Sequence, residues 1–407
     1  MVSMNERVRL AYVVSHPIQY QAELLRRIAA DPRIDLRVFF CSDFSLRSYK
    51  DAGFGVTVEW DVPLTQGYIS TVLPRWRDTS KPSPLRPISR GFFRELRKGV
   101  DGKPFDAVWI HGYSTVNSIH AILAAKALGI PVLLRAESWL ADRVRSGQKL
   151  FAKQAFFTIL RSLVNAVLPI GTENARYWAH YLGKDFPAFL MPYAVNNGYF
   201  SARAKQAEAT RSNLQAELSL DPSRPVILFA SKLQERKHAD HLLEAYLQLR
   251  ARSSSAPYLV IVGDGEMRSA LEKRVAESGV TDVRFAGFRN QSELPRFFDL
   301  SDVFVLPSRH EAWGLITNEA MASGLAVIVT SDVGCAADIV RNGENGFVYP
   351  IGDIQTLSHA LEKTIQPGVP EQMGRHSEEI IAHWGYAEDI AGLKAALRHV
   401  TGKNAGA

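Results

Sequence analysis

Residues 303–324 read Val-Phe-Val-Leu-Pro-Ser-Arg-His-Glu-Ala-Trp-Gly-Leu-Ile-Thr-Asn-Glu-Ala-Met-Ala-Ser-Gly. The first four residues are an apolar run that predicts a buried strand, and residues 316–322 have the spacing of a helix. Gly314 lies in the loop between them. A strand that passes through a glycine loop into a helix is the repeating unit of doubly wound α/β domains.

The same alternation continues on both sides of this stretch. Short apolar runs predict strands at residues 8–14, 35–39, 107–110, 132–134, 166–169, 226–230, 258–262, 283–286, 303–306 and 326–330. Helical spacing is found at residues 19–29, 116–128, 239–252, 267–278, 293–300 and 316–322. The strands are continuous apolar runs, as in parallel sheets that are covered on both faces. We therefore predict an α/β protein with two doubly wound, Rossmann-like domains.

The chain length of 407 residues is enough for two such domains. We expect one domain over residues 1–195, a second over 196–377, and a C-terminal helix and tail over 378–407, with helical spacing at 378–398. Residues 201–224 are polar and rich in alanine, and they predict one exposed helix between the two sheets. The periodicity of the last helix does not indicate where it packs.

Composition excludes several classes of protein. Hydrophobic residues make up 46% and charged residues 22%, which is typical of a globular protein. No apolar run approaches the roughly 18 residues of a membrane-spanning helix, and the apolar run at 10–14 is too short for a secretory signal. The two cysteines, Cys41 and Cys335, lie in opposite halves of the chain and cannot build a disulfide framework. We expect a reduced, cytoplasmic setting.

Charge is unevenly distributed. The net charge is +6, but residues 1–195 contain 26 Lys and Arg against 16 Asp and Glu, whereas residues 196–407 contain 22 against 26. This imbalance predicts that the first half meets an anionic partner: a phosphorylated substrate, a membrane surface or a nucleic acid. The basic residues are not accompanied by a recognisable nucleic-acid-binding module or a stripe of stacking aromatic residues. We therefore do not expect nucleic acid as the partner.

One basic segment is amphipathic. Ile88, Phe92, Leu96 and Val100 recur at four-residue intervals among several arginines. Two interpretations are open: a helix that lies on an anionic membrane face near a lipid-linked acceptor, or a basic helix that packs on its own domain.

The loop between strand and helix in residues 303–324 has the features of an anion site. The backbone N–H groups of Gly314 and Leu315 would lie at the helix N-terminus, where they can cradle a diphosphate. Glu311 and Glu319 flank this position. Because a phosphate repels carboxylates, we expect them to accept hydrogen bonds from sugar and ribose hydroxyls. The alternative is that Glu311 caps the helix and Glu319 is a solvated helix residue.

A basic loop follows the strand at residues 226–230. It contains Lys232, Arg236 and Lys237, and ligands of open α/β sheets bind at this carboxyl end of the strands. Lys232 and Lys237 are candidates to neutralise the diphosphate as it leaves. The alternative is a solvated basic loop.

Glycine-rich turns follow the next two strands. Gly263 and Gly265 belong to Val-Gly-Asp-Gly, and Ala-Gly-Phe-Arg at 286–289 contains Phe288. Each turn is a weak signal, because strand-end turns commonly need glycine. Together they place four strand ends in one row that faces a ligand.

We identify no metal site and no enzyme nucleophile. Asp43, Asp264 and Asp302 each stand apart from a second ligand at useful spacing.

Jointly, these motifs resemble the donor-binding domain of the retaining glycosyltransferases of family 4, which have the GT-B fold. The resemblance rests on Glu311-x7-Glu319 with Gly314-Leu315 between, Lys232-x4-Lys237, Val262-Gly-Asp-Gly and Gly343-Glu-Asn-Gly-Phe-Val. It extends to Ser15-His-Pro-Ile-Gln-Tyr, similar to the opening of a bacterial subset, and to Leu168-Pro-Ile-Gly-Thr-Glu, similar to the strand end before the interdomain region.

The resemblance implies a nucleotide sugar, a UDP- or GDP-sugar, in a cleft between the two domains. It implies roles for the following residues: Glu319 on the ribose, Lys232 and Lys237 on the diphosphate, Glu311 on the transferred sugar, Phe288 or its neighbours at the base, and His111 at the donor sugar. We expect His16 and Glu137 on the acceptor side. It further implies retention of configuration with no required metal or cofactor. The acceptor would be a glycan, a lipid-linked sugar or a small molecule, and the enzyme would be cytoplasmic, with peripheral contact to the membrane as a hypothesis.

The sequence departs from the family pattern at three places. Lys232 stands where many members have arginine, so that a point charge replaces a bidentate group. His238 replaces a glycine often found after the loop lysine, and His16-Pro17 replaces paired glycines in the first loop.

A rival within the same fold is a nucleotide-sugar epimerase, which would convert the donor without an acceptor. The Glu311-x7-Glu319 arrangement favours transfer.

Overall fold

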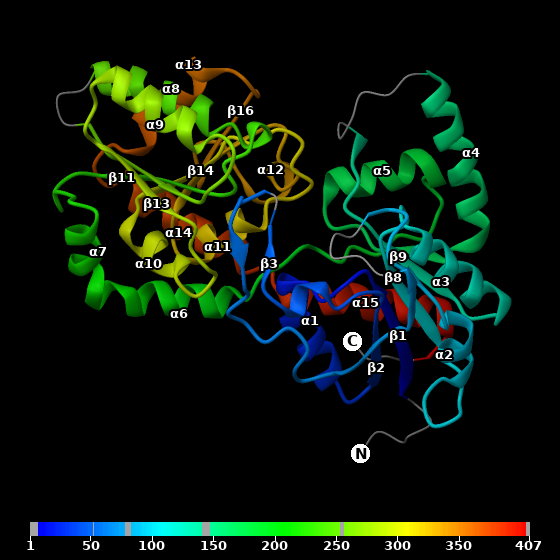
Figure 1. The fold of residues 1–407 in the computed structure, drawn as a ribbon. Coiled ribbons are helices and arrows are strands. Elements are labelled where there is room, and N and C mark those ends of the chain that lie inside the picture. The colour runs from blue at the N-terminus through cyan, green and yellow to red at the C-terminus, as the bar shows by residue number, and fades with distance from the viewer. Residues whose placement is uncertain (1–6, 52, 78–82, 141–146, 253–255, 404–407) are drawn as a thin grey trace. The chain divides into compact units, whose positions relative to one another are not determined.

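The computed structural model describes residues 7–51, 53–77, 83–140, 147–252 and 256–403. The chain forms two compact units, each an α/β domain with a parallel sheet (Figure 1). The first unit comprises Met1–Tyr49, Val62–Tyr193 and Tyr386–Ala407, and the second comprises Lys50–Asp61 and Ala194–Gly385. The predicted fold class, two doubly wound Rossmann-like domains, is confirmed.

The first unit is built on six parallel strands in the order β10-β9-β8-β1-β2-β5. These strands are β1 (Val8–Val14), β2 (Ile34–Phe40), β5 (Ile69–Val72), β8 (Ala107–His111), β9 (Val132–Arg135) and β10 (Ala166–Val167). Its helices are α1 (Gln19–Ala30), α2 (Phe92–Lys98), α3 (Val116–Ala127), α4 (Gly147–Leu163), α5 (Thr172–Leu182) and α15 (Tyr386–Thr401). The central strands β1, β8 and β9 are buried over nearly their whole length, which explains why their sequences are continuous apolar runs.

The second unit has six parallel strands in the order β13-β12-β11-β14-β15-β16. They are β11 (Val226–Ala230), β12 (Tyr258–Val262), β13 (Val283–Gly287), β14 (Val303–Leu306), β15 (Ala326–Thr330) and β16 (Gly346–Tyr349). Helices α8 (Ala239–Arg252), α9 (Arg268–Ser278) and α13 (Ile354–Thr364) cover one face. The other face carries α6 (Asn197–Ala207), α10 (Leu294–Leu300), α11 (Leu315–Ala322) and α14 (Val369–Ile381) (Figure 1).

All ten strands expected from the sequence are present, with ends that differ by no more than two residues. The edge strand β5 was not predicted, because three of its four residues are exposed and its sequence is not an apolar run. The polar segment 201–224 forms α6 and the short helix α7 (Arg211–Glu217), where one helix was expected.

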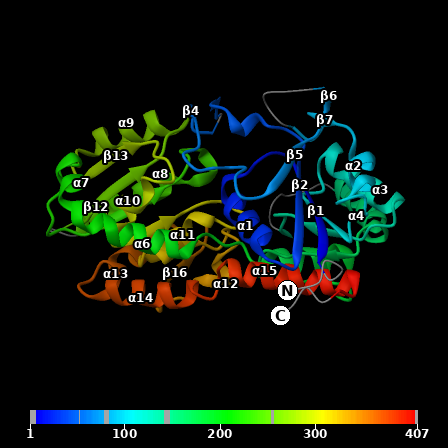
Figure 2. The same ribbon diagram turned by 90° about the horizontal axis from the view of Figure 1, so that it is seen from below.

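The C-terminal part of the chain differs from the expectation of one helical stretch at 378–398. Two helices, α14 and α15, are separated by a break at residues 382–385. Helix α14 belongs to the second unit and α15 to the first, where α15 contacts α1 and β8 (Figure 2). Helix α15 also packs closely on the segment before Tyr193, because a Cβ on Gly392 would lie 1.8 Å from the carbonyl oxygen of Leu190. Helix α15 therefore completes the first unit although it is the last element of the chain.

A second excursion was not visible in the sequence. Residues 50–61, which include the hairpin strand β4 (Thr57–Val58), leave the first unit and belong to the second. Asn290 Nδ2 donates a hydrogen bond to the carbonyl oxygen of Glu59 at 2.9 Å, and the backbone N–H of Ser292 donates to Asp61 at 3.2 Å. Residues 50–61 therefore belong to the second unit, although they precede the main boundary near Tyr193 by more than 130 residues.

The amphipathic segment at 88–100 is not a membrane-facing helix. Ile88 lies in a two-residue strand, β7 (Ile88–Ser89), and the helix α2 begins only at Phe92. Phe92, Leu96 and Val100 are buried in the core of the first unit. The membrane interpretation of this segment is therefore wrong, because the apolar side chains on which it rested are covered by the segment's own domain. Within the described residues, no helix is long and apolar enough to cross a membrane.

One buried ion pair fastens α15 to the first unit. The Arg135 side chain at the end of β9 is 1% exposed and that of Asp389 in α15 is 2% exposed, with Nη2 and Oδ1 3.4 Å apart. The same guanidinium donates hydrogen bonds to the carbonyl oxygens of Met191 and Pro192 at 2.7 and 3.3 Å and lies over the ring of Tyr193. Arg135 thus joins three segments that are distant in the sequence.

Burial raises the pKa of the Asp389 carboxyl to about 7, although the Arg135 charge opposes this change. At pH 8, where the carboxyl is ionised, the variant Asp389→Ala is expected to lower stability by roughly 3–5 kcal/mol, because it leaves the Arg135 charge buried without its partner. The measurement is the unfolding temperature of the first unit by calorimetry. Arg398→Ala, at an exposed position of the same helix, is the control and should leave that temperature unchanged. Equal melting of the two variants would contradict this role of the pair.

Candidate functional site

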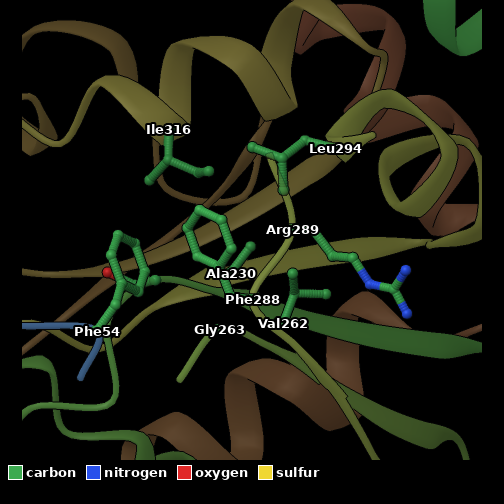
Figure 3. A pocket seen from close by; sticks show the side chains of 9 residues that line it. Phe54, Ala230, Val262, Gly263, Phe288, Arg289, Leu294 and Ile316 are labelled. Carbon is green, nitrogen blue, oxygen red and sulfur yellow. The ribbon is translucent and has the colours of Figure 1, made fainter. Parts of the chain in front are cut away.

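The carboxyl ends of the strands in the second sheet surround a cavity of about 90 Å³. The residues that line it come from the ends of β11, β12 and β13, from α10 and α11, and from the excursion at 50–61. They are Phe54, Ala230, Ser231, Val262, Gly263, Phe288, Arg289, Leu294 and Ile316. The lining is mostly apolar, and Figure 3 shows the side chains of Phe54, Ile316 and Leu294 around it.

Two aromatic rings form one wall of this cavity. The centroids of Phe54 and Phe288 are 4.7 Å apart, with the ring planes at 71°. The guanidinium of Arg289 points away from Phe54 (Figure 3). It bonds instead to Glu293 and Glu217, each at 3.2 Å. The two rings pack edge to face on each other, and together they give the cavity an apolar aromatic wall.

The two glycines after β12 are required by close backbone packing. Gly263 has φ +133°, and a Cβ there would lie 1.9 Å from the carbonyl oxygen of Ser231. A Cβ on Gly265 would lie 2.6 Å from the carbonyl oxygen of Leu233. Both glycines let the turn after β12 lie directly against the loop after β11, which carries the candidate lysines.

The variant Gly263→Ala is expected to destabilise the second unit by more than the roughly 1–2 kcal/mol that a left-handed backbone alone costs an alanine, since Ser231 must also move. Gly279→Ala is the matched control, because Gly279 has φ +69° and nothing lies within 4 Å of a Cβ there. Thermal unfolding compares the two. A Gly263→Ala protein as stable as the control would contradict the packing argument.

Lys237 and Glu311 are brought together as an ion pair. Lys237 Nζ donates to Glu311 Oε2, and Arg236 Nη1 lies 3.4 Å from the same oxygen. Lys237 is only 7% exposed. Burial lowers its pKa, and the Glu311 carboxylate opposes that change by favouring the charged ammonium.

The backbone around Glu311 holds the pair in place. The N–H of Arg309 donates to the carbonyl oxygen of Arg236 at 2.8 Å, so the loops after β11 and β14 are joined directly. The N–H of Glu311 donates to the carbonyl oxygen of Asp332 at 3.1 Å, which fixes the loop on its other side. Glu311 does not cap the helix, which was the alternative interpretation. Helix α11 begins after Gly314 and has no side-chain cap.

Lys232 is paired with a carboxylate that the sequence did not indicate. Its Nζ lies 2.8 and 2.9 Å from the two oxygens of Asp51 and 4.7 Å from the ring centroid of Phe54. Burial alone would raise the pKa of Asp51, but the Lys232 ammonium and the backbone N–H groups of Phe54 and Gly53 lower it. The Asp51 carboxylate is thus the anionic partner of the Lys232 ammonium.

Helix α11 supplies the remaining candidates. Gly314 has φ +93°, and a Cβ there would lie 2.9 Å from Leu306 Cδ2, so a glycine is needed where the loop enters the helix. Glu319 lies three residues after Ile316, on the same side of the helix as the cavity. Burial raises the pKa of Glu319 to about 8. The Glu319 side chain is half-buried, so it is not the fully solvated helix residue of the alternative interpretation.

The raised pKa of Glu319 has a consequence for stability. The folded protein holds a proton on this carboxyl up to about pH 8, whereas the unfolded chain loses it near pH 4.5. Stability is therefore lost as pH rises through that window, at no more than about 1.4 kcal/mol per pH unit. We expect Glu319→Gln to have a flatter dependence of unfolding temperature on pH between 5 and 8. Identical profiles for the variant and the unchanged protein would contradict it.

The first unit contains a separate polar cluster at the carboxyl ends of β1, β8 and β9. His111 Nε2 lies 3.5 Å from Oε1 of Glu137, and the side-chain amide of Gln21 lies 3.0 Å from His111 Nδ1. Tyr20 donates to Glu137 Oε1 at 2.7 Å, and Tyr193 donates to the same oxygen. Burial alone would raise the pKa of Glu137, but the bonds from His111 and the two tyrosines lower it to about 2. The carboxylate is thus ionised and oriented.

His16 belongs to the same edge. It follows β1, its Nδ1 is 2.8 Å from the hydroxyl of Ser15, and its ring packs on Phe44. Burial and the nearby His111 lower the pKa of His16 to about 4, so the ring is neutral at physiological pH. The structure therefore brings together His16, His111 and Glu137, the three candidates of the first half.

Several members of these clusters could not be found from the sequence. Asp51 and Phe54 lie about 180 residues before Lys232 and carry no motif. Tyr20 ends the Ser15-His-Pro-Ile-Gln-Tyr stretch, which was the available signal for it. Among the described residues, His238, Asp240 and His241 form one group that could hold a metal ion, and it lies at the start of α8 outside the cavity lining. The sequence search for metal ligands did not consider it.

Comparison with known sequences matches a segment of the second unit. Residues 210–379 match the family model described as glycosyl transferases group 1. The chain is 29% identical over 177 residues to an alpha-D-kanosaminyltransferase of Streptomyces kanamyceticus, which covers 43% of this chain and 45% of that protein. The chain spans less than half the length of this curated relative.

Comparison with solved structures covers nearly the whole chain. HepE of Anabaena, solved in complex with UDP, has a TM-score of 0.70 at 15% identity, over 96% of this chain and 99% of that one. Sucrose-phosphate synthase of Thermosynechococcus elongatus has a TM-score of 0.68 at 18% identity, over 97% and 100%. The family match is confined to residues 210–379, and the solved structures show that the fold of both units is the GT-B fold.

Proposed function

We propose that this protein is a glycosyltransferase that moves a sugar from a nucleotide diphosphate sugar to an acceptor with retention of configuration. The observation that carries the proposal is the second unit's cavity, walled by Phe54 and Phe288 and bordered by the loop of Lys232 and Lys237. An apolar slot with the Lys232 ammonium 4.7 Å from the centroid of its Phe54 wall has the chemistry of a nucleoside diphosphate site.

The donor is assigned to this edge as follows. The base lies against Phe288, and Glu319 accepts hydrogen bonds from the ribose hydroxyls one helical turn from Ile316. The diphosphate is bound by Lys232, Lys237 and the backbone N–H groups at Gly314 and Leu315, the start of α11. Gly263 and Gly265 allow the close backbone approach that shapes the slot.

In this proposal the diphosphate competes for ammonium groups that already have partners. Lys232 is bonded to Asp51, and Lys237 to Glu311. An ammonium group has three N–H donors, so each lysine can bind a phosphate oxygen while keeping a carboxylate. Glu311, held in place by Lys237 and Arg236, keeps its other oxygen for hydroxyls of the transferred sugar.

The chemical step needs stabilisation of the charge that develops on the leaving diphosphate. Preorganised cations and N–H groups aimed at such charge are typically the largest catalytic contribution. The two lysines and the helix N-terminus supply it here, and we propose that no metal or other cofactor is required. We assign no enzyme nucleophile.

The first unit supplies the remaining groups. His111, oriented by Gln21 and Glu137, is assigned to the donor sugar. His16 and Glu137 are assigned to the acceptor, which is a glycan, a lipid-linked sugar or a small molecule. The positive charge of the first half, noted in the sequence, favours an acceptor with anionic groups. We propose that the reaction takes place in the cytoplasm.

The names of relatives bear on donor and reaction. HepE has been solved with UDP and with UDP-glucose, and a Mycobacterium tuberculosis relative is named as a GDP-mannose-dependent mannosyltransferase. UDP- and GDP-sugars are therefore the first donors to test. The relatives are named as transferases, which favours transfer over epimerisation of the donor.

The deciding experiment incubates the purified full chain with UDP-, GDP- and dTDP-sugars and measures release of the nucleoside diphosphate. We expect slow release from one donor class, because water replaces the absent acceptor. An epimer of the donor as the product would favour the isomerase, and no binding of any nucleotide sugar would contradict the proposal.

Two variants separate donor binding from turnover. Glu319→Ala is expected to weaken nucleoside diphosphate affinity, because the ribose loses its acceptor, whereas Lys237→Ala is expected to slow turnover by about 10²–10³. Lys273→Ala, whose side chain is 78% exposed on α9, is the control. Affinity is measured by calorimetry and turnover by product release. Wild-type affinity in the first variant or wild-type turnover in the second would refute these roles.

A further inference from the structure

We propose that the first unit docks on an anionic membrane surface through the outer side of α2, α3 and α4. These helices form one layer of the unit, in which α3 contacts both α2 and α4 (Figure 1, Figure 2). Their solvent-facing side is called the α2–α4 face below. Binding to a membrane does not require sugar transfer, so the docking itself is independent of the proposed function.

Exposed apolar side chains are concentrated in the first unit. Among the described residues, every exposed large apolar side chain belongs to this unit, and the described part of the second unit has none. Phe93 of α2, Leu123 of α3, and Leu150, Phe151 and Ile159 of α4 are members of this set. Large exposed apolar surfaces commonly mark sites where a partner or a membrane binds.

Helix α4 has a stripe of exposed apolar residues. Phe151, Ala155 and Ile159 recur at four-residue intervals and are all exposed, Phe151 at 79% and Ile159 at 63%. Phe157 and Leu160 are on the opposite side of the helix and are buried in the core of the unit. Helix α4 therefore has two apolar sides, and only one of them packs on its own domain. In this it differs from the segment at 88–100.

A cavity of about 390 Å³ continues the apolar surface between α3 and α4. Its lining includes Ile119 of α3, Phe156 of α4 and Leu85, which precedes β7 and is 67% exposed. Leu123 lies one helical turn after Ile119 and is also exposed. The apolar side chains of α3, α4 and the loop before β7 thus belong to one surface.

The charge of the α2–α4 face favours one kind of partner. The three helices contain seven Lys and Arg residues and a single acid, Glu95. Exposed pairs with Glu95 and Asp185 reduce this charge but leave it positive. A second copy of the chain on the same face would bring like charges together. Apolar residues interleaved with Lys and Arg are typical of helices that lie in the headgroup region of anionic bilayers.

The α2–α4 face adjoins the candidate acceptor groups. Tyr113 lines its cavity and lies two residues after His111, the last residue of β8. His111 in turn contacts Glu137. One consequence rests on the proposed function: of the three acceptor classes, a lipid-linked sugar fits this placement best.

The test is co-sedimentation of the purified full chain with phosphatidylglycerol vesicles, compared with phosphatidylcholine vesicles. We expect binding to the anionic vesicles, a loss of affinity at high salt because salt screens the attraction, and much weaker binding to phosphatidylcholine. No binding to the anionic vesicles, or equally tight binding to both, would overturn the proposal. Nucleoside diphosphate release from a soluble donor is measured without vesicles and reports on the proposed function separately.

A double variant tests the apolar stripe. Phe151→Gln with Ile159→Gln is expected to fold, because both positions are exposed and glutamine is a good helix former; an unchanged unfolding temperature checks this. Its affinity for phosphatidylglycerol vesicles should fall by about tenfold or more, because two apolar side chains no longer enter the bilayer. Leu190→Gln is the matched control, since Leu190 is also exposed but lies against α15, and it should bind as the unchanged protein does.

A charge variant tests the other half of the proposal. Lys149→Glu on α4 should weaken binding to phosphatidylglycerol vesicles, whereas Lys273→Glu on α9 of the second unit should not. Equal vesicle binding by the double variant and by Leu190→Gln would overturn the proposal. A dimer that the double variant loses, without vesicle binding by the unchanged protein, would assign the face to a contact between two copies instead.

Discussion

Parallel pairing of buried strands is the constraint on which the rest of the structure depends. It directs the loop after every strand in a sheet to the same edge, whatever the distance in sequence. In the second unit this edge gathers Ser231, Gly263 and Phe288 around one cavity. In the first unit the same rule gathers His16, His111 and Glu137. The position of each candidate site thus follows from strand direction. The side chains in the loops at that edge give the site its chemistry.

Most of the fold could be predicted because buried parallel strands have unbroken apolar sequences. Part of the candidate site could be predicted for a related reason. Lys237 and Glu311 follow strands β11 and β14, which are neighbours in the sheet. The spacing of residues along the chain does not predict features that depend on tertiary contacts. Phe92, Leu96 and Val100 have the same spacing on a membrane-facing helix as on one that packs into its own core. Asp51 reaches Lys232 across 181 residues, and no local pattern records such a contact.

The candidate cations of the second unit are already neutralised by carboxylates. Lys232 has Asp51, and Lys237 has Glu311. A buried ammonium group without a partner would be strongly destabilising, so Glu311 is needed beside the buried Lys237 in the folded chain as well as for any ligand. The geometry also explains why Lys237 and Glu311 occur in separate motifs: each loop supplies one half of the pair. Sequence reasoning assigned the two residues to different groups of a ligand, and the structure adds that they orient each other.

The order of the segments along the chain has a consequence for synthesis. The first unit uses residues from both ends of the chain, and Asp389 on α15 is the partner of the buried Arg135. A nascent polypeptide that emerges from the ribosome can therefore form its first sheet early, but the charge of Arg135 stays unpaired until Asp389 has been synthesised more than 250 residues later. The second unit is synthesised in between and must fold while its neighbour is incomplete. A gene fragment that ends near residue 195 would encode six strands but not the helix that closes over them.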